Sequence, residues 1–201
     1  MENSVLFKLG YGLYVLTAQH EGKDNGCIIN TAMHVAGGLS LGGVIAINKL
    51  SHTRDMIVKS KKFNISILTT ETPFDIFQRF GFQSGTTVDK FSGCEGVVRS
   101  KNGVVYLTKY ANAYLSFDVS DTTDFGSYTM FKAEITDSGI ISDAESLTYA
   151  YYRQYIKPKL QAGVKTGYRC AACGYVEESG SLPADFVCPF CKHYSIYFEK
   201  I

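Results

Sequence analysis

The sequence predicts a closed or nearly closed antiparallel β-barrel with a few short helices, followed by a small cysteine-rich unit. Three observations lead to this prediction. Short apolar runs of strand length recur over residues 11–135. Glycine is frequent, with 19 residues, and proline is rare, with 4, which suits strands joined by tight turns. Four of the six cysteines gather at the C-terminal end.

The first half of the barrel is expected to begin with a short helix and then a strand within residues 5–17. The polar residues 20–25 are expected to form a hairpin turn that ends in Asn25-Gly26, a strong type I′ signal, so residues 27–32 should form the return strand. The glycine-rich residues 37–43 are expected to be a loop, which leads to a short buried strand over residues 44–48.

The second half adds two helices and five further strands. One helix is expected over residues 53–59, with Ser51 or Thr53 as its cap, and another starts at Pro73. Apolar runs of strand length predict the strands at residues 63–68, 96–98, 104–109, 113–119 and 128–135.

The four C-terminal cysteines form two C-x-x-C motifs, Cys170–Cys173 and Cys188–Cys191, with 14 residues between them. In a chain that starts without a secretion signal, thiols are expected to stay reduced, so paired C-x-x-C motifs indicate a metal site. Four thiolates arranged as a tetrahedron select zinc or iron. The spacing alone leaves both metals open.

The residues around these cysteines resemble rubredoxin, in the short form found at the end of rubrerythrins. The resemblance rests on residues 168–175, 182–191 and 197–198. It implies one redox-active iron held by Cys170, Cys173, Cys188 and Cys191. It also implies aromatic side chains packed beneath the iron, at Tyr168, Tyr175, Phe186 and Phe198. Lys192 departs from the pattern, because glycine is usual there.

Residues 157–166 are polar and carry both proline and glycine, which is typical of an interdomain linker. We therefore expect a barrel domain over residues 1–158, a linker over 159–166 and a rubredoxin-like four-cysteine domain over 167–201.

Charge and hydropathy exclude several classes of partner. The net charge of the chain is +1, and residues 167–201 carry three basic and four acidic side chains, which argues against nucleic acid. No apolar run reaches the roughly 18–20 residues that span a bilayer, so no membrane is expected. The N-terminus lacks the basic region and apolar core of a signal peptide, so a cytoplasmic protein is expected.

The barrel carries neither a dinucleotide-binding nor a P-loop motif. Nearly all of residues 1–158 nevertheless resembles the flavin-reductase-like domains of the FMN-binding split-barrel family. The matching segments are residues 25–33, 46–49, 51–57, 79–85, 89–91 and 147–153. Joined to a C-terminal rubredoxin, such a domain resembles the high-molecular-weight rubredoxins of anaerobes.

The family resemblance implies an FMN site, although FAD stays open. The residues implied along the isoalloxazine edge are Asn30, Thr31 and Ala32. Those implied for the phosphate are Lys49, Ser51, His52 and Thr53, since a phosphate needs a cation and short donors at a helix start. Those implied to close over the cofactor are Ser84, Gly85 and Lys90. No catalytic side chain is expected, because a cofactor carries the hydride chemistry.

The resemblance implies an electron-transfer flavoprotein. Reducing equivalents would pass from NAD(P)H, directly or through a reductase, by way of FMN to the iron held by the four cysteines. The acceptor would be an oxygen- or peroxide-reducing iron protein such as a flavodiiron protein or a rubrerythrin. A homodimer is also expected, because flavin sites of this family usually lie near the subunit interface.

Three alternatives stay open at this point. The chain could be a pure electron carrier without NAD(P)H activity. It could be a flavin reductase with a structural zinc ribbon. The ribbon could also be an interaction module for another protein or a nucleic acid.

Overall fold

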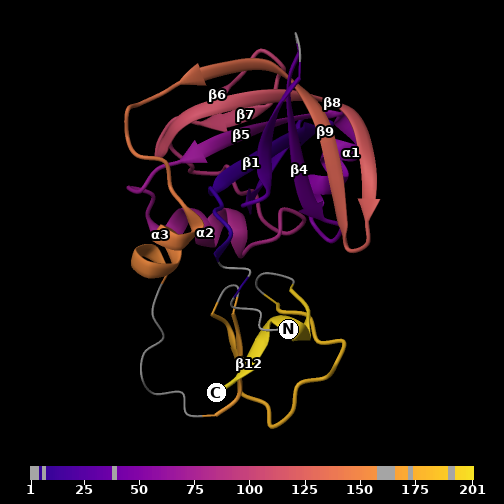
Figure 1. The fold of residues 1–201 in the computed structure, drawn as a ribbon, viewed down its shortest axis with the longest axis vertical. Coiled ribbons are helices and arrows are strands. Elements are labelled where there is room, and N and C mark those ends of the chain that lie inside the picture. The colour runs from indigo at the N-terminus through magenta and orange to yellow at the C-terminus, as the bar shows by residue number, and fades with distance from the viewer. Residues whose placement is uncertain (1–4, 6–7, 38–39, 158–165, 172–173, 190–192) are drawn as a thin grey trace.

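The computed structural model describes residues 5, 8–37, 40–157, 166–171, 174–189 and 193–201. Seven antiparallel strands form one sheet in the order β2-β1-β5-β8-β9-β4-β3 (Figure 1). Their bounds are β1 Tyr14–His20, β2 Lys23–Ile29, β3 Ala32–Gly37, β4 Ser40–Asn48, β5 Lys62–Leu68, β8 Ala111–Phe125 and β9 Tyr128–Ile140.

The two edges of this sheet are close neighbours in the chain. β2 ends at Ile29 and β3 begins at Ala32, although they stand at opposite ends of the strand order. The sheet must therefore curl until these edges approach each other, with a split between them. This confirms the mainly β, split-barrel class with few helices that the sequence predicted.

The barrel interior is filled by aliphatic and aromatic side chains. Phe63 on β5 and Phe117 on β8 stack with their ring centroids 4.7 Å apart, and both are buried. Each fully buried side chain of this size contributes about 1.5–3 kcal/mol relative to an exposed one. A short ribbon of β6 (Val97–Arg99) and β7 (Val105–Leu107) lies against β1, where Thr17 Oγ1 donates to Val105 O.

The turn between β1 and β2 lies within the predicted region 20–25, but at its start and not at Asn25-Gly26. His20 pairs with Lys23, so the loop is Glu21-Gly22, with φ of 50° and 75°. These two positive φ values are typical of a type I′ turn. Asn25-Gly26 lies inside β2 instead. A Cβ on Gly26 would come within 3.0 Å of Leu16 O and 3.2 Å of the Phe80 ring, so close packing explains this glycine.

The prediction of a loop over residues 37–43 was also wrong where the structure describes them. β4 begins at Ser40 and pairs with β3 and β9. Gly43 stands where a Cβ would meet the Phe117 ring at 2.8 Å, so this glycine makes room for core packing. The short helix expected near residue 5 falls largely outside the described residues.

The helices lie at one end and one side of the barrel. Both helices predicted from the sequence are present, as α1 (His52–Ser60) and α2 (Phe74–Gly81). A short α3 (Tyr149–Tyr151) continues into the π-helical turn η2 (Tyr152–Ile156). Tyr152 packs on Phe77 of α2 with ring centroids 4.4 Å apart. Among the described residues, no helix has both the length and the apolar character that crossing a membrane needs.

Residues 166–201, called the tail below, form a separate small sheet in the order β11-β10-β12. Its strands are β10 Tyr168–Cys170, β11 Val176–Glu177 and β12 Phe198–Lys200, and the 3-10 turn η3 covers Ser195–Tyr197. Figure 1 shows the tail beneath the end of the barrel that carries α2 and α3.

Candidate functional site

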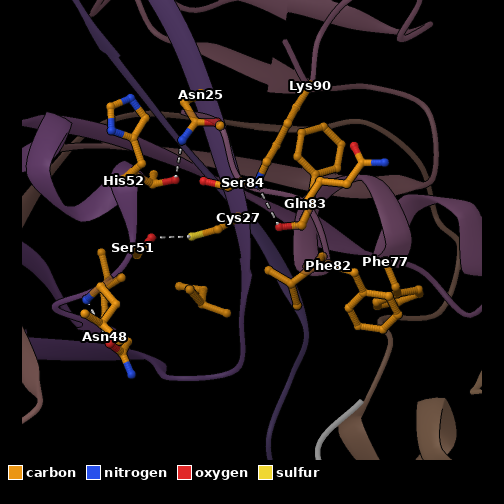
Figure 2. A pocket seen from close by; sticks show the side chains of 18 of the residues that line it. Asn25, Cys27, Asn48, Ser51, His52, Phe77, Phe82, Gln83, Ser84 and Lys90 are labelled. Atoms are coloured by element: carbon orange, nitrogen blue, oxygen red, sulfur yellow. Dashed lines mark hydrogen bonds between the residues drawn. The ribbon is translucent and has the colours of Figure 1, made fainter. Parts of the chain in front are cut away.

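A cavity of about 790 Å³ opens where β2 and β4 end, beside the start of α1 (Figure 2). Its volume lies within the range of small-molecule and cofactor sites, roughly 300–1,000 Å³. Eight of the ten residues expected to contact a flavin line this cavity, namely Asn30, Thr31, Ser51, His52, Thr53, Ser84, Gly85 and Lys90. The fold thus brings together residues that lie far apart in the sequence.

The start of α1 forms one wall of the cavity. Ser51 takes the N-cap position, and its Oγ lies 3.8 Å from Cys27 Sγ instead of turning toward the helix. The first N–H groups of a helix have no acceptor inside the helix, and the helix dipole favours an anion there. His52 and Thr53 follow in the first turn and also line the cavity. This wall therefore suits a phosphate group.

The buried side-chain amide of Asn25 connects the start of α1 with the segment at Gly85. Asn25 Nδ2 donates to Thr53 Oγ1 at 3.0 Å, and Asn25 is 4% exposed. Gly85 lies directly against the Asn25 side chain, with no space for a Cβ. The Asn25-Gly26 pair predicted a turn, so this role of Asn25 was not foreseen, although Asn25 begins one of the segments that resemble flavin-reductase-like domains.

Hydroxyl groups gather on the segment that begins at Ser84. Ser84 Oγ and Thr86 Oγ1 are 2.8 Å apart, and the N–H of Thr86 donates to Ser84 Oγ at 3.3 Å. The N–H groups of Thr87 and Val88 both donate to Ser84 O, which folds the segment into a compact turn. Ser84, Thr86 and Thr87 all line the cavity, so this turn offers it a row of short hydroxyl donors.

Lys90 is a buried cation at the cavity wall. Its Nζ donates to Gly26 O at 2.8 Å and to Phe80 O at 3.3 Å, and the residue is 4% exposed. An ammonium group has three donors, and these two carbonyls take two of them. Burial lowers the pKa of Lys90, whereas burial raises the pKa of the neighbouring Cys27 thiol. Lys90 therefore ties β2 to α2 at the cavity.

An apolar wall faces these polar groups. It is made of aromatic side chains from α2, α3 and η2 and their neighbours. These are Phe77 and Phe80 of α2, Phe82 just after α2, Tyr149 of α3 and Tyr152 of η2. Phe77 and Phe80 lie one helical turn apart on α2, and both are buried. A cavity with hydroxyls and a helix start on one side and aromatic rings on the other matches a ligand that joins a phosphate to a flat ring system.

Two of the expected flavin-contacting residues lie elsewhere. Ala32 lines a second, smaller cavity of about 160 Å³ together with Met33 and His34. Lys49 Nζ lies 2.6 Å from Asp124 Oδ2, in an ion pair between the end of β4 and the β8–β9 hairpin. The neighbouring Asn48 and Leu50 line the large cavity.

The described residues at the two ends of each C-x-x-C segment make the same backbone hydrogen bond. The Cys170 N–H donates to Tyr175 O at 2.8 Å, and the Cys188 N–H donates to His193 O at 2.8 Å. Just outside each of these bonds, Arg169 pairs with Val176 and Val187 pairs with Tyr194. The residues that flank the two motifs thus pair in the same pattern, which agrees with two matching knuckles around one metal.

The surroundings of Cys170 and Cys188 fit a metal-binding centre. Both residues are 0% exposed. Phe198 pairs with Cys170 across the tail sheet, and its ring contacts those of Phe186 and Tyr175, with centroids 5.2 and 6.5 Å away. These contacts agree with the expected aromatic packing at three of the four positions.

The other two expected ligands, Cys173 and Cys191, lie outside the described residues. The described part of the chain holds no group of three or more His, Cys, Asp or Glu side chains that could bind a metal.

Comparison with known proteins identifies the family of the barrel. A family model described as "Flavin reductase like domain" matches residues 6–158. The chain belongs to the flavin-reductase-like family. Over the whole of both chains it is 31% identical to a high molecular weight rubredoxin of Moorella thermoacetica. It is 33% identical to a ferric-chelate reductase (NAD(P)H) of Archaeoglobus fulgidus, over 79% of this chain and 93% of that one.

Solved structures support the same flavin-reductase-like fold. An NADH:FAD oxidoreductase of Streptomyces globisporus C-1027 superposes with a TM-score of 0.64 and 17% identity, over 73% of this chain and 89% of that chain. At this identity the likeness shows the fold alone. Family membership and the two curated relatives together support flavin-linked electron transfer as the kind of chemistry.

Proposed function

We propose that this protein is an electron-transfer flavoprotein that carries FMN and one iron held by four cysteines. It takes reducing equivalents from NAD(P)H, directly or through a reductase, and delivers electrons to an oxygen- or peroxide-reducing iron protein. A flavin exchanges electrons in pairs or singly, whereas an iron held by four thiolates exchanges one at a time. Each hydride carries two electrons, so it corresponds to two single-electron reductions of the metal.

The observation that carries this proposal is the cavity that gathers eight of the expected flavin-contacting residues. In the proposed site, the start of α1 at Ser51, His52 and Thr53 receives the phosphate, together with the hydroxyls near Ser84. Asn30 and Thr31 bound the ring edge. The Thr31 hydroxyl donates to Ala46 O at 2.6 Å, which holds the link between β2 and β3 against β4.

The proposed iron centre uses residues 167–201 as a rubredoxin-like module, joined to the barrel domain by residues 159–166. Cys170, Cys173, Cys188 and Cys191 are the proposed ligands. Support comes from the matching hydrogen bonds of the two knuckles and from the full-length similarity to a high molecular weight rubredoxin. The backbone places Cys170 and Cys188 at equivalent positions of their loops.

We also propose a cytoplasmic homodimer. Exposed apolar side chains on three neighbouring strands, β3, β4 and β9, support the dimer, since Met33 is 63% exposed, Leu41 58% and Ile140 85%. Large exposed apolar groups are candidates for contact with a second subunit where they form one contiguous patch. A flavodiiron protein or a rubrerythrin is the proposed class of acceptor.

An absorption spectrum with metal analysis tests this function on protein purified without added zinc. We expect one flavin and one iron per chain, and anaerobic addition of NADH, with or without a reductase, should bleach both. A colourless tail containing zinc would favour a flavin reductase with a structural ribbon. Bleaching only when a separate reductase is present would show that the reducing equivalents arrive through that reductase and that the chain itself does not oxidise NADH. Absence of flavin would refute the proposal.

A further inference from the structure

The large cavity has a wall that belongs to the tail. Pro189 and His193 line it together with the residues of the barrel. Both are close neighbours of Cys188, because Pro189 follows it directly and His193 O accepts its N–H at 2.8 Å. One bonded neighbour and one hydrogen-bonded neighbour of a proposed metal ligand therefore face the proposed flavin site.

A second contact fixes the other half of the tail to the barrel. Lys157, next to η2, donates from Nζ to Ala171 O at 3.0 Å. Its Cε lies 3.6 Å from the position of a Cβ on Gly174, which is ordinary van der Waals contact. Ala171 and Gly174 both belong to the loop that starts at Cys170. The tail thus meets the barrel through both of its cysteine loops.

The turn η2 links the cavity to the contact between Lys157 and the tail. Tyr152 begins this turn, is 5% exposed and lines the cavity, while Lys157 follows its last residue. The N–H of Lys157 donates to Tyr152 O at 2.7 Å, which holds the two residues in fixed relation. η2 packs on Phe77 and therefore holds Tyr152 at the cavity wall and Lys157 at the contact with the tail.

We propose that the tail docks with its cysteine loops on the mouth of the flavin cavity of its own chain and completes the flavin site there. Pro189 and His193 form the closing wall, and Lys157 is the positioning residue that holds the dock. This proposal rests on the proposed function, because it identifies the tail of the same chain as the structure that faces the bound flavin. Docking shortens the path between the two cofactors and shields the flavin from solvent on this side.

The absence of tryptophan from the chain provides a clean test. Pro189→Trp places a single indole on the cavity wall. Glu178→Trp is the matched control, because Glu178 is exposed and follows β11 at the end of the tail sheet opposite the cysteine loops. Both full-length variants are loaded with zinc, which removes redox effects, and are titrated with FMN while indole emission is recorded.

We expect FMN to quench the indole at position 189 at least fivefold and the indole at position 178 less than twofold. Adding Lys157→Glu to the Pro189→Trp variant should bring the quenching close to that of the control. FMN binding followed by equal quenching at both positions would overturn the docking proposal. Failure of FMN to bind either variant or the natural chain would instead overturn the proposed function.

The rate of FMN dissociation provides a second test, which does not depend on the folding of the Pro189→Trp variant. In zinc-loaded protein, we expect Lys157→Glu to speed FMN dissociation about fivefold, because the shielding wall is released. Lys157→Arg keeps the cation and should leave the rate within twofold of the natural chain. Equal dissociation rates for both Lys157 variants and the natural protein would overturn the proposal.

Discussion

The side chain of Asn25 occupies the space that a Cβ on Gly85 would need, while its Nδ2 donates to Thr53 Oγ1 at 3.0 Å. One buried amide thus sets the distance between the Gly85 segment and the start of α1. Both elements line the same cavity, so its width depends on a glycine at position 85.

Gly85→Ala should therefore weaken flavin binding and lower stability together. The added methyl group must displace the Asn25 amide, which breaks the hydrogen bond to Thr53. Overpacking of this kind costs about 1–3 kcal/mol. We expect a loss of that size in the free energy of unfolding, measured by urea denaturation, and about a tenfold weaker FMN affinity. Gly10→Ala is the control, since no atom lies within 4 Å of its Cβ position. Equal behaviour of the two variants would contradict the role of Gly85.

Because Lys90 is buried, we expect the free energy of unfolding to depend on pH in a specific range. Burial lowers its pKa in the folded protein, while a lysine in the unfolded chain titrates near ~10.4. Between these two values the unfolded state binds more protons, so the free energy of unfolding rises with pH. Below the lowered pKa both states are protonated, and this contribution stays constant.

Lys90→Met should remove that rise. The natural chain should gain stability relative to the variant as the pH is raised toward ~10.4, and each unit of pKa shift corresponds to about 1.4 kcal/mol of that gain. Urea denaturation at several pH values measures the difference. Lys62→Met, at an exposed position of β5, should keep the pH dependence of the natural chain. Parallel curves for the natural chain and Lys90→Met would show that Lys90 does not cause the rise.

Much of the fold followed from local sequence patterns. Alternating apolar residues and helix start signals located β5, α1 and α2, because these elements each follow one simple rule. The position of the β1–β2 turn could not be predicted from local patterns. Both Glu21-Gly22 and Asn25-Gly26 could form the turn, and only tertiary packing distinguishes them. Gly26 is needed against Phe80, which leaves the turn to Glu21-Gly22.

The site was predictable to the extent that it resembles a known family. The roles of Asn25 and of Pro189 were not predictable, because both depend on contacts between distant parts of the chain. Asn25 lies 28 residues from Thr53, and Pro189 reaches the cavity only through the docked tail. No local pattern reports such contacts.

The ion pair between Lys49 and Asp124 leads to an opposing pair of predictions. If Lys49 holds the phosphate, as the family resemblance implies, it must leave Asp124 when FMN binds. Lys49→Ala should then weaken FMN binding about ten- to a hundredfold, the usual effect of losing a charge-assisted contact. Asp124→Asn should strengthen binding severalfold, because it frees the lysine. Titration calorimetry at low salt measures both, and unchanged affinity in both variants would remove Lys49 from the phosphate site.

The last prediction separates the two cofactors. Cys170 and Cys188 are buried at equivalent positions of two matching loops, while the residues proposed for the flavin phosphate belong to the barrel. Cys170→Ser and Cys191→Ser should therefore each lose the metal and still bind one FMN per chain. Cys94→Ser is the matched control, because Cys94 lies in the barrel sequence and outside both motifs, and it should keep both cofactors. Metal analysis and flavin absorbance on the same samples give the two stoichiometries. A variant of Cys170 or Cys191 that loses flavin along with the metal would show that the barrel needs an intact metal centre to hold its cofactor. The docked tail would then be required for flavin binding, instead of shielding a flavin that the barrel holds by itself.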